Sequence, residues 1–150
     1  MKLSRNFSLA ELIKSDTAIR KGIDNNPNAD QIEKLKLLCE NILQPIRDEW
    51  GVVSVSSGYR SEILSEKIGS SRKSQHCRGQ AADFECYGVD NRELFDWITQ
   101  NLDFDQAILE FYDGDANSGW LHVSYNEEGN RKQTLRAFRN DAGKTQYEEI

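Results

Sequence analysis

Two histidines and one aspartate are the residues in this sequence best suited to bind a metal ion. His76 and Asp83 lie in "SQHCRGQAADFE", and His122, the only other histidine, lies in "WLHVSY". Two imidazoles and one carboxylate can hold Zn²⁺ and leave a fourth position for water. The cation can lower the pKa of that water to about 7, which creates a hydrolytic nucleophile at neutral pH. Because a His-x6-Asp spacing has little specificity, two surface histidines and a solvated aspartate are an equal alternative on residue types alone.

Two of these residues are expected to lie on β-strands. In "QAADFEC" (residues 80–86), small and apolar side chains alternate with acidic ones, which predicts a strand with Asp83 on its polar face. His122 lies on a second alternating segment, residues 120–126, and His76 precedes the first strand in a loop. The site would therefore form where two strands and one loop meet.

Apolar periodicity and turn residues predict the other elements. Apolar side chains recur at three- and four-residue steps in residues 30–50, which predicts the main helix, kinked or restarted at Pro45. Helices precede most of the strands, so we expect a single α+β domain over residues 1–150, with a mainly antiparallel sheet and a flexible tail over about 141–150. The further expected elements are a short helix capped by Ser8, a strand over 52–57, a short helix ending near 67, a helix over 90–101, and strands over 105–113 and 132–139.

The composition narrows the class of protein. The net charge of −6 disfavours a protein that binds nucleic-acid phosphates, and no apolar run approaches the roughly 20 residues that span a bilayer. The N-terminal residues contain no continuous apolar segment and no small-residue cleavage site, so we expect no signal peptide. Three cysteines without a CxxC spacing do not predict a disulfide framework. Cys77 is not expected to bind the metal beside His76, because adjacent side chains on extended backbone point apart.

Three motifs together support a metal site more strongly than the His-x6-Asp spacing does alone. "SGYRS" (57–61), "SQHCRGQAADFE" (74–85) and "WLHVS" (120–124) occur in this order. They resemble the zinc D-Ala-D-Ala carboxypeptidase family, whose pattern is SGYRS, then SxHxxGxAxD, then a strand ending in WxH. "FSLAELIKSDTA", "GIDNNP" and "LQPIRDEWG" also have counterparts in the subgroup found in phages and bacteria. The resemblance covers roughly residues 5–125 and implies the hedgehog/DD-peptidase fold, a twisted antiparallel sheet with helices packed on one side.

The resemblance also implies a set of metal and substrate residues. Carried over by position, His76, Asp83 and His122 would bind one zinc ion. Ser74 would bind the terminal carboxylate or the backbone of the substrate. Arg60 would stabilise the oxyanion that forms at the scissile carbonyl, a role that suits a guanidinium group.

The general base and the walls of the cleft are less directly implied. In some relatives a glutamate lies three residues before the last histidine ligand, but this chain has Gly119 there. The nearest upstream candidate is Glu110, which the phage-type subgroup also has and which would face His122 across a hairpin. Tyr59, beside Arg60, and Trp120, two positions before His122, are candidate substrate-binding walls. Asp113 and Asp115 are weaker substitutes for the base.

The function that the resemblance implies is zinc-dependent hydrolysis of a peptide bond in peptidoglycan stem peptides, next to a D-amino acid. The enzyme would be a D,D-carboxypeptidase or an endolysin-type endopeptidase. We expect synthesis in the cytoplasm without stable membrane insertion, followed by action on the cell wall after release by a holin-type partner. A virion component and a cytoplasmic murein-recycling peptidase fit equally. The alternative is a zinc-binding structural or wall-binding module without activity, which Gly119 keeps open.

Overall fold

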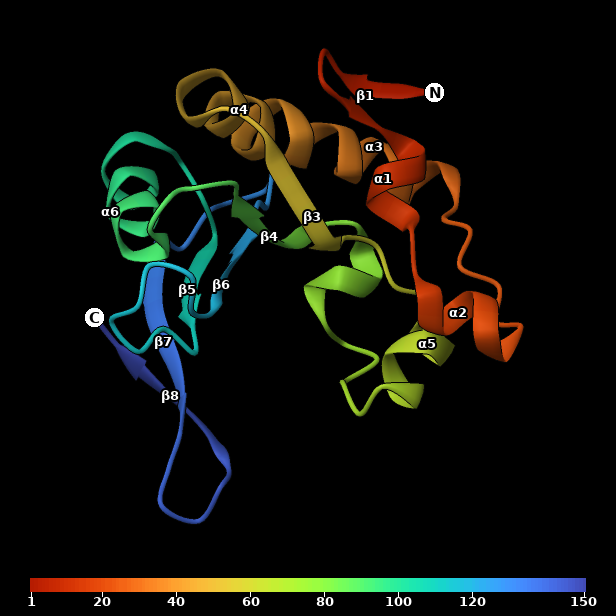
Figure 1. Cartoon of the computed structure of the whole chain (residues 1–150). Helices are drawn as coiled ribbons and strands as arrows, with labels where there is room; N and C mark the ends of the chain where they lie inside the picture. Colours follow the sequence, from red (N-terminus) through yellow and green to blue (C-terminus); the bar gives the residue numbers. More distant parts are fainter.

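A mixed six-stranded sheet forms the centre of the computed structural model, which describes all 150 residues (Figure 1). In their order across the sheet the strands are β3 (Val53–Ser57), β4 (Ala81–Cys86), β6 (Trp120–Ser124), β5 (Gln106–Glu110), β7 (Gln133–Arg139) and β8 (Thr145–Glu149). Neighbouring strands are antiparallel except β5 and β7, which are parallel. The predicted α+β class with a mainly antiparallel sheet is therefore confirmed, with one parallel pair added.

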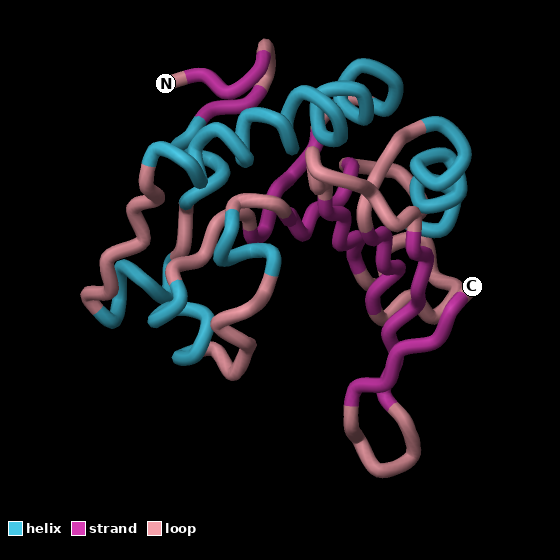
Figure 2. Tube along the Cα trace, turned by 180° about the vertical axis from the view of Figure 1, so that it is seen from behind, coloured by secondary structure: helices cyan, strands magenta, loops and turns pink.

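Helices cover one face of this sheet. Leu38 of α3 (Ala29–Leu38), Ile46 of α4 (Gln44–Trp50) and Ile98 of α6 (Asn91–Asn101) are fully buried in the core cluster. Phe84 and Leu121 from the sheet are buried with them. Figures 1 and 2 show these helices gathered along one side of the strands. The opposite face of the sheet carries none of these three helices and is called the open face below. The helices are α1 (Leu9–Ile13), α2 (Asp16–Lys21), α3 (Ala29–Leu38), η1 (Cys39–Leu43), α4 (Gln44–Trp50), α5 (Glu62–Lys67), η2 (Gln75–Arg78) and α6 (Asn91–Asn101).

The main helix is continuous but changes its winding before the proline. Asn28 caps its start in a reciprocal capping box with Gln31, and Gly51 ends it. Between α3 and α4, η1 is a π-helical turn, and Pro45 lies in the first turn of α4. Because proline cannot donate an α-helical hydrogen bond, the wider turn before it accommodates the missing bond without ending the helix.

Three parts of the fold differ from the expectation. Residues 75–78 form the short 3-10 helix η2 and not a loop, and α2 was not predicted. The expected flexible tail over 141–150 is corrected, because β8 pairs antiparallel with β7. The sequence "TQYEE" is polar and exposed throughout, so it carries no apolar alternation that would have indicated a strand. A 2.7 Å ion pair between Arg136 and Glu148 joins the two strands.

The N-terminus adds a small second ladder. β1 (Lys2–Ser4) and β2 (Phe7–Ser8) pair antiparallel beside α1, whose predicted cap, Ser8, is confirmed. None of the helices in the protein has the length and apolar character needed to cross a membrane.

A buried carboxylate ties η2 to the far strands of the sheet. Asp105, directly before β5, is 2 % exposed. It accepts hydrogen bonds from the Arg131 guanidinium at 2.9 and 3.0 Å, from the Arg131 backbone N–H at 2.9 Å, and from Nε2 of Gln75 at 2.9 Å. The hydrogen bonds from Arg131 are the main reason that the pKa of Asp105 lies below its ordinary value. This contact fixes the segment that carries His76.

Replacing Asp105 with alanine should lower the free energy of unfolding of the metal-free protein by about 2 to 4 kcal/mol, because several donors lose their buried acceptor. Urea unfolding at pH 7 measures the change. Asp103→Ala is the matched control, because Asp103 is exposed and its ion pair with Lys132 is long, with 3.8 Å between Oδ1 and Nζ. That variant should change the free energy by less than about 1 kcal/mol. Equal effects of the two substitutions would contradict the role assigned to Asp105.

Candidate metal centre

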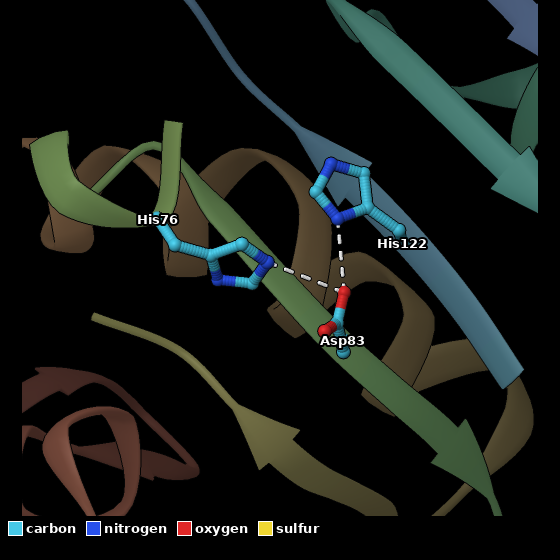
Figure 3. Close-up of side chains that lie close together, drawn as sticks. All are labelled: His76, Asp83 and His122. Carbon is cyan, nitrogen blue, oxygen red and sulfur yellow. Dashed lines mark hydrogen bonds and ion pairs between the residues drawn. The ribbon is translucent and has the colours of Figure 1, made fainter. Parts of the chain in front are cut away.

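Strands β4 and β6 and the short helix η2 bring three metal-ligating side chains together. Asp83 and His122 are direct partners in the antiparallel register of β4 and β6. Oδ1 of Asp83 lies 2.9 Å from Nδ1 of His122 and 3.3 Å from Nε2 of His76. The carboxylate therefore sits between the two imidazoles (Figure 3). One ligand atom from each residue lies within 4.8 Å of the others.

The spacing of these atoms suits a tetrahedral zinc ion. With bonds of about 2.0 to 2.1 Å, ligand atoms around zinc lie about 3.3 Å apart. The two measured separations of 2.9 and 3.3 Å are close to that value. No cysteine belongs to the cluster: Cys77 is buried, and its Sγ lies 3.8 Å from the carbonyl oxygen of Ser71. Two nitrogens and one oxygen with a remaining open position form the donor set of a hydrolytic zinc site rather than of a closed structural one.

A backbone carbonyl sets the orientation of His76. Its Nδ1 lies 2.7 Å from the carbonyl oxygen of Gly58, so the N–H of Nδ1 donates there and Nε2 keeps its lone pair toward Asp83. Gly58 has to be a glycine for this contact, because a Cβ at that position would overlap the backbone of Leu12. The glycine of "SGYRS" thus allows the chain to approach α1 closely while its carbonyl orients a ligand.

The turn after His76 also depends on a glycine. Gly79 ends η2 with a φ of +76°, and a Cβ there would meet the carbonyl oxygen of Gln31 at 2.5 Å. The side chain of Gln31 donates to the carbonyl of Cys77 at 3.2 Å. Contacts of Gln31 in α3 with Cys77 and Gly79 therefore hold η2 in place.

Burial and the neighbouring charges favour the ligand forms of the cluster in the metal-free protein. Burial lowers the pKa of His76, although the nearby carboxylate of Asp83 opposes this shift. Burial raises the pKa of Asp83, but the neighbouring imidazoles of His122 and His76 outweigh it and hold this pKa well below its ordinary value. A neutral imidazole and an ionised carboxylate are the forms that bind a metal ion.

The cluster opens into a cavity of about 580 Å³ on the open face of the sheet. Arg60 and Ser74, both predicted from the sequence, line it beside the metal cluster. The buried Nε–H of Arg60 has no hydrogen-bond partner in the protein. The hydroxyl of Ser74 accepts from the backbone N–H of His76 at 3.2 Å, so this residue also caps η2.

Glu110 is the other carboxylate that lines this cavity. It ends β5 and is the register partner of Trp120 on β6. Burial, and then the charge of Asp83, raise the pKa of Glu110 to about 7 in the metal-free protein. A carboxylate with such a pKa can both accept and release a proton near neutral pH. Asp113 and Asp115 lie in the following loop, where they accept hydrogen bonds from backbone N–H groups, and they do not line the cavity.

The backbone leaves no room for a carboxylate at position 119. Gly119 has a φ of +68°, and a Cβ on it would overlap the carbonyl oxygen of Glu110. Phe111, directly after Glu110, also has a positive φ of 56°, a conformation that is strained for a residue with a side chain. A base in this cavity has to come from another position, and Glu110 is the residue that the fold brings there.

Two residues expected to form walls of the cleft are not among the residues that line the cavity. Tyr59 is only 5 % exposed and packs in the hydrophobic core. Its backbone N–H donates a hydrogen bond to the carbonyl of Leu12 in α1, which holds it there. Trp120 does not line the cavity. Its ring packs against Phe111 with 5.3 Å between centroids. Tyr59 is therefore not a wall of the cavity. Trp120 is the register partner of Glu110 and shares its face of the sheet, and its role as a substrate-binding wall stays a prediction.

Other cavity residues were not found from the sequence. Period-two alternation along β5 places Gln106 and Ile108 on the same face as Glu110, so that signal was available. The remaining residues depend on strand order and on the conformation of a loop, neither of which the local pattern specifies. The unpredicted lining residues are Ser70, Gln75, Gln106, Ile108, Gln133, Leu135 and Tyr147.

Comparisons with known proteins agree with this geometry. A family model described as Peptidase M15 matches residues 5–124. The matched segment contains all three residues of the metal cluster, together with Arg60 and Glu110. No curated protein gives a significant match to the chain.

The raised pKa of Glu110 should make the metal-free protein less stable as the pH rises. The folded state holds this proton up to about pH 7, whereas the unfolded state releases it near pH 4.3. Wild type should therefore lose up to about 3 kcal/mol relative to Glu110→Gln between pH 4.3 and 8. Urea unfolding in a chelator measures the difference, with the exposed Glu127→Gln as control. Parallel pH profiles for wild type and Glu110→Gln would contradict the burial of this carboxyl group.

Gly119→Ala should lower the free energy of unfolding by more than about 2 kcal/mol, because strain at a positive φ adds to a backbone overlap. Gly114→Ala is the matched control in the same connection. Gly114 has a φ of +101° but open space around its Cα, so only strain of about 1 kcal/mol should appear. Thermal unfolding of both variants measures the difference. If the alanine is tolerated equally at both positions, the close approach at Gly119 is wrong.

Proposed function

Because the chain belongs to the peptidase M15 family, a family of zinc-dependent metallopeptidases, we propose that it hydrolyses a peptide bond in peptidoglycan stem peptides. The bond adjoins a D-amino acid, and the enzyme acts as a D,D-carboxypeptidase or as an endopeptidase. The observation that carries the proposal is the convergence of His76, Asp83 and His122 in one cavity with a free carboxylate, Glu110, and a free guanidinium group, Arg60.

Each residue of the cavity has a distinct part in this reaction. His76, Asp83 and His122 would hold a zinc ion, which would supply a Lewis acid and lower the pKa of a water molecule to about 7. Glu110 accepts the proton of the attacking water on its carboxylate and delivers it to the leaving amine. Arg60 donates hydrogen bonds to the oxygen that gains negative charge, in a cavity that keeps its guanidinium group partly out of water. Ser74 faces the same space and binds the peptide.

The base in this mechanism is supported by position as well as by charge. Glu110 belongs to the strand beside the one that carries His122, so its carboxylate is held by the sheet and not by a mobile loop. The contact between Phe111, the next residue in the chain, and Trp120, the partner of Glu110 on β6, restricts the end of β5 further. A carboxylate fixed beside the cluster is what proton transfer in the cavity requires.

Digestion of purified peptidoglycan followed by mass spectrometry tests the activity, the metal requirement and the cleaved bond together. Zinc-loaded protein should release fragments that correspond to hydrolysis next to a D-amino acid, a chelator should abolish the release, and added Zn²⁺ should restore it. Fully zinc-loaded protein that cleaves no peptidoglycan peptide would overturn the enzymatic proposal and favour a non-catalytic zinc-binding module.

Glu110→Gln should lower kcat by about 10² to 10⁴-fold at equal zinc content, because the amide cannot accept the proton. Assays that are stopped at set times, with a stem peptide that the wild-type protein cleaves as substrate, measure kcat. Elemental analysis measures the zinc content of the same samples. Glu127→Gln, an exposed substitution of the same kind, should keep wild-type kcat. A zinc-loaded Glu110→Gln variant with wild-type kcat would show that another group moves the proton.

A further inference from the structure

The C-terminal hairpin forms one wall of the peptidase cavity although it lies outside the matched residues 5–124. Strands β7 and β8 add to the sheet beside β5 and project away from the rest of the molecule at their turn (Figure 1). Gln133 and Leu135 of β7 and Tyr147 of β8 line the same cavity as the metal cluster. The site is thus built partly by a segment that the family motifs do not include.

Strand register explains how the hairpin reaches the metal cluster. Asp83 is paired with His122, His122 with Ile108, and Ile108 with Leu135 across four neighbouring strands. Because directly paired residues point to the same face of a sheet, these side chains form one row on the open face. Leu135 and Ile108 extend the row of metal ligands with an apolar surface.

A neighbouring row of paired residues on the same face contains Tyr147. Glu110 is paired with Ala137, and Ala137 with Tyr147. Alanine rises little above the sheet, so the ring of Tyr147 can lie toward the cavity over it. The charges of Glu110 and Asp83, after burial, raise the pKa of Tyr147, which agrees with a phenol facing these carboxylates. Tyr147 lies at the exposed rim of the cavity, where a ligand can reach it.

The two sides of the cavity differ in chemistry. Arg60, Ser74 and Gln75 form a polar side next to His76. On the opposite side, Ile108 and Leu135 line the cavity and belong with Ala137 to a small apolar cluster that is separate from the main core. Gln106 and Gln133, whose side chains hydrogen bond to each other at 2.8 Å, line the cavity beside them. A peptide that crosses the metal cluster therefore meets a cation and hydroxyl at one end, and apolar side chains, two amides and one phenol at the other.

We propose that Tyr147 is a substrate-binding residue and that its ring, with Ile108 and Leu135, forms a subsite for an uncharged side chain next to the cleaved bond. The phenol hydroxyl donates a hydrogen bond to a backbone carbonyl of the substrate. This inference rests on the proposed peptidase function, which it deepens by assigning the hairpin to substrate selection. The ion pair of Arg136 with Glu148 and the hydrogen bond from Thr134 to the carbonyl of Ile150 at 2.6 Å keep β8 in the register that presents Tyr147.

Two substitutions at Tyr147 and one neighbouring control test the subsite. The probe is the synthetic stem pentapeptide L-Ala-γ-D-Glu-L-Lys-D-Ala-D-Ala, used with zinc-loaded full-length protein. Tyr147→Phe should raise KM by about 2- to 12-fold, the equivalent of one hydrogen bond, with kcat within about twofold of wild type. Tyr147→Ala should raise KM further. Gln146→Ala, an exposed change on the opposite face of β8, should behave as wild type.

A binding measurement separates this inference from the proposed function. Calorimetric titration of the same pentapeptide into zinc-loaded Glu110→Gln should give a lower Kd than titration into the Glu110→Gln, Tyr147→Phe double variant, by the same 2- to 12-fold. Equal Kd values in the two proteins would overturn the subsite, whether or not wild type is active. Weaker binding by the double variant, together with a wild type that cleaves nothing, would support the subsite and overturn only the peptidase proposal. A lower unfolding midpoint in Tyr147→Phe, with unchanged Kd, would show that the residue is merely structural.

Discussion

The pairing of Asp83 with His122 across β4 and β6 is the constraint on which the site depends. A sheet repeats its side-chain direction every two residues, so a slip of one residue would move Asp83 from the open face into the core. The opposite face of β4 prevents that slip, because Ala82 and Phe84 are fully buried against the helices. The hydrophobic core thus specifies the position of a polar cluster on the other face of the sheet. Asp105 extends this constraint to η2 and hence to His76, the ligand that lies outside the sheet.

Glycines at close backbone contacts complete the arrangement. Gly58 lets the chain approach α1, and its carbonyl orients His76, while Gly79 lets η2 turn into β4. Gly119 allows the connection between β5 and β6 to pass close to the carbonyl of Glu110. The same contact that removes a side chain from position 119 therefore fixes the strand end that carries the carboxylate. The departure from the pattern of some relatives is consistent with a base supplied from the neighbouring strand.

Much of the site was predictable because its signals are local. Alternation in residues 80–86 identified the strand and the face of Asp83. The resemblance of the three motifs pointed to the three residues that cluster in the structure and to Arg60 in the same cavity. Tyr59 was misplaced because the pattern does not tell which residue of "SGYRS" turns into the core. The hairpin wall was missed for two physical reasons. β8 is polar and exposed, and the position of Tyr147 depends on the parallel pairing of β5 with β7, which joins residues far apart in the chain.

Zinc K-edge X-ray absorption spectroscopy tests the central claim most directly, because it reports the atoms bound to the ion in the protein loaded with one equivalent of Zn²⁺. The geometry of His76, Asp83 and His122 predicts one tightly bound zinc per chain, with only nitrogen and oxygen neighbours at about 2.0 to 2.2 Å and the scattering signature of two imidazoles. His122→Ala should lose one of those imidazoles. A sulfur neighbour at about 2.3 Å, which would come from a cysteine such as Cys77, or the absence of stoichiometric zinc, would contradict the account.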